Sequence, residues 1–147
     1  MRPAVLALLL FLACCGPKPI TLEDFPTRPL TLPGGRVLRV ETMTTNFELL
    51  RGLMYRTSLA PDHGMLFVYP KPNYYQMFMY QTLIPLDIVW LDSDRRIVAM
   101  NENAQPCKTQ ASKCPKYGGK LMATFGLQMA GGMARKYSLQ LGQTDQW

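Results

Sequence analysis

The sequence is poor in the residue types on which most catalytic sites depend. It contains one histidine and four cysteines among 147 residues. No serine lies in the Gly-x-Ser-x-Gly pattern that exposes a nucleophile in many hydrolases. The histidine, His63, lies in the turn-like sequence Pro61-Asp62-His63-Gly64, where a lone histidine is more often solvated than catalytic. Because no nucleophile and base pair is evident, we expect a non-catalytic protein without a cofactor.

Acidic residues are also scarce, with 10 Asp and Glu against 16 Lys and Arg, which gives a formal net charge of +6. The basic residues are scattered, in pairs such as Arg95-Arg96 and Arg135-Lys136, rather than gathered in a stripe. A nucleic-acid-binding protein would show such a stripe, so we expect no nucleic-acid partner. We interpret the excess of positive charge as solvated surface or mild attraction to anionic lipid and polymer.

No apolar run is long enough to cross a bilayer as a permanent helix. The block from Ala4 to Ala13 follows the basic Arg2 and ends at a small residue, a pattern typical of a signal peptide. A buried N-terminal helix is the alternative, but the block has no polar face and is soon followed by prolines. We therefore expect a signal peptide over residues 1–15 and a protein exported to the cell envelope or secreted.

The end of the apolar block, Phe11-Leu12-Ala13-Cys14, resembles the bacterial lipobox, in which the cysteine is acylated after cleavage. Phe11 departs from the usual leucine, and a second frame would place the modified residue at Cys15. We predict acylation of Cys14 and contact with a membrane through this lipid anchor only, with secretion as a free protein as the alternative. The proline-rich residues 16–35 are predicted to be an extended tether.

The remaining cysteines, Cys107 and Cys114, lie in the segment PCKTQASKCPKYGG, which has turn composition throughout. In an oxidising compartment such a pair favours a disulfide. A zinc site is the rival interpretation, but zinc requires four nitrogen or sulfur ligands, and the sequence offers one histidine and no further cysteine pair in this region.

Residues 36–147 are expected to form one β-rich domain, which we expect to be a monomer. Apolar residues alternate with period two, which predicts strands, over residues 37–42, 65–69, 75–80, 86–91, 96–100 and 121–129. Asp92-Ser93-Asp94 predicts a hairpin between two of them. Thr45 and Glu48 fit a capping box, and a second helix is predicted over 132–137, followed by a last strand at Leu139 and Leu141. The fold class is mostly β (β-rich α+β), a small antiparallel barrel or sandwich with one or two short helices.

Several short blocks occur in a fixed order between about residues 38 and 143. They are Arg51-Gly52-Leu53-Met54, Arg56, Leu59, Gly64-Met65-Leu66-Phe67, Phe78-Met79, Thr82, Pro85-Leu86-Asp87, Leu127-Gln128-Met129, Gly132 and Gly142. In these blocks the sequence resembles domain-of-unknown-function family 192. The resemblance implies a compact β-rich fold, frequent export and no assigned activity. This chain has Tyr80 where the family's usual phrase has a lysine, and the neutral Gln128 where the family commonly has an acid.

The charged residues of the matched blocks, Arg51, Arg56 and Asp87, suggest a polar patch at the mouth of the β core. Two guanidinium groups can hold a carboxylate or phosphate bidentately, so we predict a binding domain for a small anionic ligand or an envelope partner. The predicted apolar floor of this site comprises Met54, Met65 and Met79, and Thr82 is a further predicted ligand-binding residue. The structural alternative is that Asp87 caps backbone amides or pairs with an arginine inside the fold.

Two other functions remain open. The first is a hydrolase of an envelope polymer that uses Asp87 as a general base, which requires a cleft with Asp87 at its bottom. The second is a Cu(I)-binding protein with a site formed by Met77, Met79 and His63, because the two methionines lie two apart on a predicted strand and thioethers are soft ligands. The alternative for these methionines is core packing, since the side chain fills irregular gaps and aromatic residues surround these strands in sequence.

Overall fold

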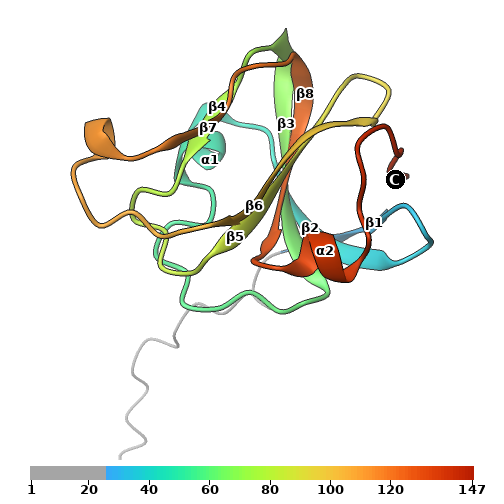
Figure 1. The fold of residues 1–147 in the computed structure, drawn as a ribbon, viewed down its shortest axis with the longest axis horizontal. Coiled ribbons are helices and arrows are strands. Elements are labelled where there is room, and N and C mark those ends of the chain that lie inside the picture. The colour runs from blue at the N-terminus through green and yellow to red at the C-terminus, as the bar shows by residue number, and fades with distance from the viewer. Residues whose placement is uncertain (1–25) are drawn as a thin grey trace, which may run out of the picture.

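Six strands form one mixed sheet, in the order β1-β2-β3-β8-β5-β6, in the computed structural model, which describes residues 26–147 (Figure 1). These strands are β1 (Arg28–Thr31), β2 (Val37–Met43), β3 (His63–Asn73), β5 (Leu86–Leu91), β6 (Ile97–Ala104) and β8 (Ala123–Ala130). A second, two-stranded sheet consists of β4 (Gln76–Phe78) and β7 (Lys116–Gly118). The helices are α1 (Asn46–Arg51) and α2 (Met133–Lys136), with a 3-10 turn at Ala111–Lys113.

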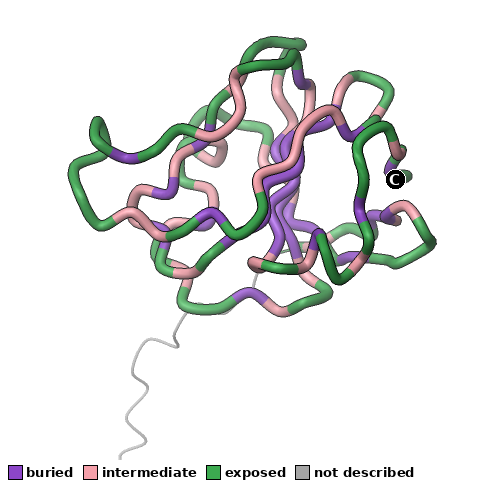
Figure 2. Tube along the Cα trace, viewed as in Figure 1, coloured by how far each residue is buried: buried purple, intermediate pink, exposed green. Residues whose placement is uncertain are grey.

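Strand β5 is buried along its whole length, because both faces of the sheet are covered. Ile88 and Trp90 point into one hydrophobic cluster, together with Met65 and Phe67. Val89 and Leu91, of opposite parity, belong to a second cluster on the other face. The buried stretch of the central strands is visible as the purple segment in the middle of Figure 2. The period-two alternation of the sequence therefore sorts side chains between two clusters.

The β-rich α+β class is confirmed, but the expected antiparallel barrel or sandwich is wrong in two respects. First, β2 and β3 pair in parallel, because the chain crosses back through α1 and the loop that follows it. Second, the sheet is not a closed barrel. The C-terminal segment makes only a single bridge to each side of the opening, Thr144 with Arg96 and Gln146 with Thr31.

The hairpin of β5 and β6 is confirmed, and the Asp92 carboxylate accepts hydrogen bonds from two amides of its turn. The capping box of Thr45 and Glu48 at the start of α1 is confirmed, and so is a short second helix. The predicted last strand at Leu139 and Leu141 is wrong, since these residues follow α2 in a turn-rich segment.

The domain begins earlier than residue 36. Strand β1 occupies Arg28–Thr31, within the predicted tether, and pairs antiparallel with β2. Leu30 and Leu32 are buried in the core, because side chains two apart on a strand share a face. Pro29 is tolerated there since β1 is an edge strand of the sheet. The predicted signal peptide, Cys14 and the first part of the predicted tether lie outside the described residues. No helix within residues 26–147 has the length and apolar character needed to cross a membrane.

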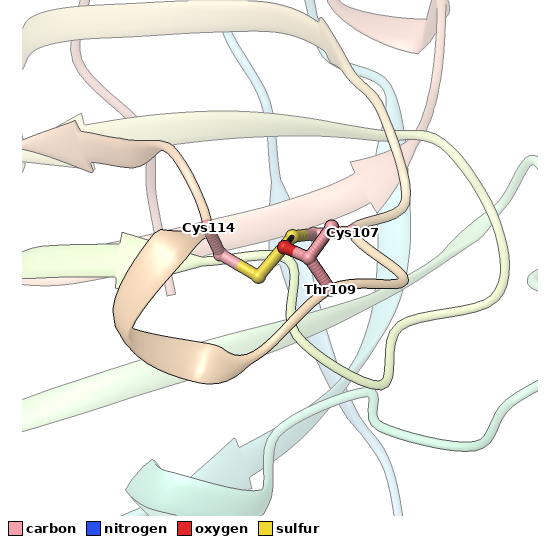
Figure 3. Close-up of a disulfide and its surroundings, with 3 residues drawn as sticks. All are labelled: Cys107, Thr109 and Cys114. Carbon is pink, nitrogen blue, oxygen red and sulfur yellow. Dashed lines mark hydrogen bonds between the residues drawn. A yellow bond between two sulfur atoms is a disulfide. The ribbon is translucent and has the colours of Figure 1, made fainter.

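The predicted disulfide between Cys107 and Cys114 is confirmed, with an S–S distance of 2.07 Å (Figure 3). It closes the loop between β6 and β7. The Thr109 hydroxyl lies 3.4 Å from the Cys107 sulfur and donates to it, because a disulfide sulfur carries no proton. The Cys107 amide donates to the Met79 carbonyl, so the bridge fixes this loop against the segment after β4.

Replacing both disulfide cysteines with serine is expected to lower the free energy of unfolding by about 2 to 3 kcal/mol, because a short cross-linked loop removes that much chain entropy from the unfolded state. Urea unfolding of the double variant and of the parent protein measures the difference. Reduction of the parent protein should reproduce the loss. Equal stability of the oxidised and reduced parent would contradict a structural role for this bridge.

Candidate functional site

A cavity of about 480 Å³ lies between α1 and the larger sheet. Its walls come from α1 and the turn after it, from β3 and from β4, and one residue of β8 forms part of its floor. The lining includes Arg51, Met54, Phe67, Tyr69, Tyr75, Met77 and Gln128. Most of the lining is apolar or aromatic, as in typical small-molecule sites, which also carry a few placed polar groups.

Gln128 is the polar group of the floor, and it is 6 % exposed. Its Nε2 donates to the Met77 sulfur at 3.3 Å. A thioether only accepts hydrogen bonds, which fixes the orientation of the amide and turns Oε1 away from the sulfur. Oε1 is buried and has no hydrogen-bond partner among the described residues. A buried acceptor without a donor costs about 1 to 3 kcal/mol, so this atom favours a ligand that brings an N–H or O–H group.

Two stacked tyrosines form a second wall. The rings of Tyr69 and Tyr75 lie 3.7 Å apart between centroids and 10° from parallel. The Tyr75 hydroxyl donates to the Lys71 carbonyl at 2.8 Å, which holds this ring in place. Burial, and to a lesser degree the neighbouring Tyr75, raise the pKa of Tyr69 above its ordinary value, so its hydroxyl is neutral. The wall therefore presents a flat aromatic surface without charge.

The turn after α1 approaches the sheet closely at Gly52. A Cβ at this position would lie 3.0 Å from the Phe67 ring and 3.9 Å from the Gln128 Oε1 atom. Gly52 also has a φ of +46°, which a residue with a side chain adopts at a cost. This glycine thus lets the backbone pass over the aromatic ring beside the unpaired amide oxygen.

The mouth of the cavity is cationic. Among the described residues that line it, Arg51 is the only one with a charged side chain, and no carboxylate lines it. Arg51 is exposed and makes no ion pair with a described residue. No residue of α1 is buried, and Phe47 and Leu50 are 71 % and 68 % exposed. The helix therefore forms an open, largely apolar rim, and Arg51 is the charged residue that it contributes to the lining of the cavity.

Asp87 does not reach this cavity. Its side chain is completely buried, and its carboxylate accepts three backbone hydrogen bonds, from Asn103, Gly132 and Ala134, at 2.7 to 3.0 Å. No described lysine or arginine lies within ion-pair distance of it. The carboxylate thus ties β5 to the start of α2. This is the capping alternative, and it leaves no cleft for a general base.

Arg56 is held elsewhere. Its guanidinium forms a bidentate pair with the Glu41 carboxylate, at 3.0 and 2.7 Å, and both side chains are largely buried. The pair joins the segment after α1 to β2. The structure therefore places Arg51, Arg56 and Asp87 in three different surroundings, and of these three only Arg51 lines this cavity.

Of the predicted apolar floor, Met54 lines the cavity. Met65 and Met79, and the further predicted ligand-binding residue Thr82, are buried and do not line it. Met77 and Met79 belong to the core cluster on that face, whereas His63 does not and shares a hydrogen bond with Asp62. A copper site built from His63 and these methionines therefore has no support. Residues 26–147 contain no cluster of three or more His, Cys, Asp or Glu side chains that could hold a metal ion.

The sequence reasoning missed the two tyrosines and treated Gln128 only as a departure from the family pattern. A signal was present in the alternation of β8. Leu127 and Met129 point into one cluster, so Gln128 between them faces the other side, where it is the polar residue on a buried face. A buried polar side chain among apolar ones calls for an explanation.

Solved structures resemble this chain over most of its length. One, of a protein of unknown function from Novosphingobium aromaticivorans, has a TM-score of 0.77 and 28 % identity, and the match covers 91 % of this chain and 94 % of that one. Another, of a Sinorhizobium meliloti protein provisionally described as a transcription regulator, has a TM-score of 0.70 and 30 % identity, and the match covers 80 % of this chain and 89 % of that one. The curated proteins include no match. A family model described as "Uncharacterized ACR" matches residues 30–147, and the chain therefore belongs to the DUF192 family.

Proposed function

We propose that this domain binds a small amphiphilic acid in the cavity between α1 and the sheet. The observation that carries the proposal is the buried, unpaired Oε1 atom of Gln128 in an otherwise apolar cavity. A ligand that donates a hydrogen bond to this oxygen relieves the cost of the unpaired acceptor. The stacked tyrosines supply a flat surface for an apolar or aromatic body.

An anionic group on the ligand would meet Arg51 at the mouth. Because this guanidinium is exposed, its contribution is expected to be modest and sensitive to salt. The proposal thus keeps the anionic ligand that the sequence led us to expect, but only Arg51 remains of the three charged residues predicted to bind it. Asp87 and Arg56 are left out, because each is already bound to groups of the protein itself.

The proposed location is the cell envelope, with the domain held by an acyl chain on Cys14. Support comes from the sequence alone, namely the apolar block after Arg2 and the cysteine at its end. Mass spectrometry of the mature N-terminus tests this. A chain that begins beyond Cys15 and carries no lipid would refute the anchor while leaving the binding proposal intact.

Transcription regulation, suggested for the Sinorhizobium meliloti protein, is a second candidate only through that description. It would require a surface for nucleic acid, and the basic residues of this chain are scattered in sequence. Binding to duplex DNA at physiological salt, with a steep salt dependence, would favour it over a small-molecule site.

The binding test uses 1-anilinonaphthalene-8-sulfonate, which combines an aromatic body, one N–H donor and a sulfonate. Gln128→Leu is expected to weaken its binding about tenfold, because the acceptor is removed while the shape of the side chain is largely kept. Arg51→Gln is expected to weaken it about threefold. N-phenyl-1-naphthylamine, which lacks the sulfonate, should lose affinity with Gln128→Leu only. Fluorescence titration measures each affinity.

Gln140→Leu is the matched control, since Gln140 is exposed and does not line the cavity. Gln128→Leu should leave the protein folded and stabilise it by about 1 kcal/mol without ligand, because an unpaired buried acceptor disappears. Near-UV circular dichroism verifies the native packing, since this dye also binds partly folded chains. Equal binding by the parent protein and Gln128→Leu would refute the cavity as the site.

A further inference from the structure

The end of the β3 and β8 pair carries large apolar side chains that no other described residue covers fully. We call residues 70–74 and 120–122 the β3–β8 tip. Tyr74, Leu121 and Met122 are 57 %, 52 % and 49 % exposed. The register pairs Asn73 with Ala123, so Tyr74 and Met122 are the next residues on the two chains, just beyond this pair. The tip projects at the top of Figure 1 and is exposed in Figure 2.

The two segments that form the tip carry charge of one sign only. Lys71 and Lys120 belong to the tip and are exposed. No acidic residue occurs between Asp62 and Asp87, or between Glu102 and Asp145, so neither segment that forms the tip brings a carboxylate. Lysines beside exposed apolar residues, in segments without carboxylates, are typical of surfaces that sit in the headgroup region of anionic membranes.

The tip is also held in shape. The Tyr74 amide donates to the Asn73 side chain at 2.8 Å, and the Tyr75 hydroxyl donates to the Lys71 carbonyl at 2.8 Å. Two prolines, Pro70 and Pro72, restrict the backbone of the same segment. A rigid turn of this kind presents its apolar side chains outward at little further entropy cost on binding.

We propose that the β3–β8 tip inserts Tyr74, Leu121 and Met122 into the interface of an anionic bilayer, with Lys71 and Lys120 at the level of the lipid phosphates. Charge complementarity selects this partner. A second copy of the tip would bring like charges together, and a nucleic acid would gain little from leucine and methionine side chains. The inference depends on neither the cavity ligand nor acylation of Cys14.

The experiment measures how deeply the tip enters a bilayer. The full chain carrying Cys14→Ser and Cys15→Ser, which excludes lipidation, is prepared with Tyr74→Trp and mixed with vesicles of equimolar phosphatidylcholine and phosphatidylglycerol. Brominated lipids quench indoles that enter the membrane. Compared with the same chain without Tyr74→Trp, the added indole is expected to lose about half of its emission, and Lys71→Gln with Lys120→Gln is expected to abolish most of this quenching.

Leu141→Trp is the control for insertion, because Leu141 is 63 % exposed but lies outside the tip, and Lys136→Gln is the control for charge. The Leu141→Trp indole should not be quenched, and Lys136→Gln should leave the quenching of the Tyr74→Trp indole unchanged. The apolar residues 4–13 can hold any variant on the vesicle, so a bound chain with an unquenched Tyr74→Trp indole would overturn the proposal. Equal quenching in vesicles of phosphatidylcholine alone would also overturn it, since the lysines would then have no role.

Discussion

Replacing Asp87 with alanine is expected to lower the free energy of unfolding by about 4 kcal/mol, because three backbone amides, one buried and two partly buried, would lose their common acceptor. Oδ1 accepts from Asn103 at 2.7 Å and from Gly132 at 3.0 Å, and Oδ2 accepts from Ala134 at 2.7 Å. Hydrogen bonds to a charged group contribute about 1.5 to 3 kcal/mol each, and a donor left buried without a partner costs about 1 to 3 kcal/mol.

The effect is large because Asp87 supplies the N-terminal cap that α2 lacks within its own sequence. This helix spans four residues, and its N-cap, Gly132, has no side chain to accept from the first-turn amides. Asp87 provides the acceptor from β5, a distant part of the chain, and also holds Asn103 near the end of β6. A negative charge at a helix N-terminus is favourable in addition to the hydrogen bonds.

Asp87→Asn separates geometry from charge. The amide keeps one oxygen acceptor but turns an NH₂ group toward one of the three donors, so we expect a smaller loss of about 2 kcal/mol. Urea unfolding measures both variants, and Asp94→Asn, at an exposed turn position, is the control. If Asp87→Ala retained the stability of the parent protein, the three hydrogen bonds would be incorrect, and a role for Asp87 outside the fold would have to be considered again.

The strands could be predicted because their signal is local. Alternation along residues 86–91 required no knowledge of neighbours, and Asp92 carried its own turn chemistry. The capping box of α1 is likewise complete within Thr45 and Glu48. Strand β1 was missed because its prolines suggested a tether, whereas only the partner strand shows that Leu30 is in the core.

The structure does not bring Arg51, Arg56 and Asp87 together. The sequence could not show this, because it does not tell which groups a carboxylate contacts. The donors to Asp87 are backbone amides, which every residue except proline possesses. Arg56 pairs with Glu41. In the sequence, Glu41 was only one position of the predicted strand over residues 37–42. The cavity required three-dimensional knowledge too, because its walls are assembled by the crossover through α1 and by the pairing of β4 with β7.

Asp145 is a buried acidic residue in the C-terminal segment. It lies between the two residues that bridge the open sides of the sheet, Thr144 and Gln146, and its amide donates to the Arg95 carbonyl. The side chain is 1 % exposed, and both carboxyl oxygens are buried without a hydrogen-bond partner among the described residues. Burial raises the pKa of this carboxyl from 3.8 to about 7.

The folded state therefore holds a proton that the unfolded state has already released between pH 3.8 and about 7. Stability falls with rising pH wherever the folded state binds more protons, so this group makes the protein less stable as pH rises through that window and has no further effect above it. A shift of about three pKa units at about 1.4 kcal/mol each gives an upper value of about 4 kcal/mol.

Asp145→Asn is expected to match the parent protein near the acidic end of this window and to exceed its free energy of unfolding by about 2 to 4 kcal/mol above neutral pH. The pKa values of Glu48 and Asp62 are lowered by hydrogen bonds, from the amides and hydroxyl of the Thr44-Thr45 segment and from His63 respectively, so these groups change stability in the opposite direction. They are present in both proteins, and the difference between the two urea-unfolding series isolates Asp145. Asp94→Asn should run parallel to the parent protein at every pH. A constant difference between Asp145→Asn and the parent protein would mean that the carboxyl does not change its protonation on folding.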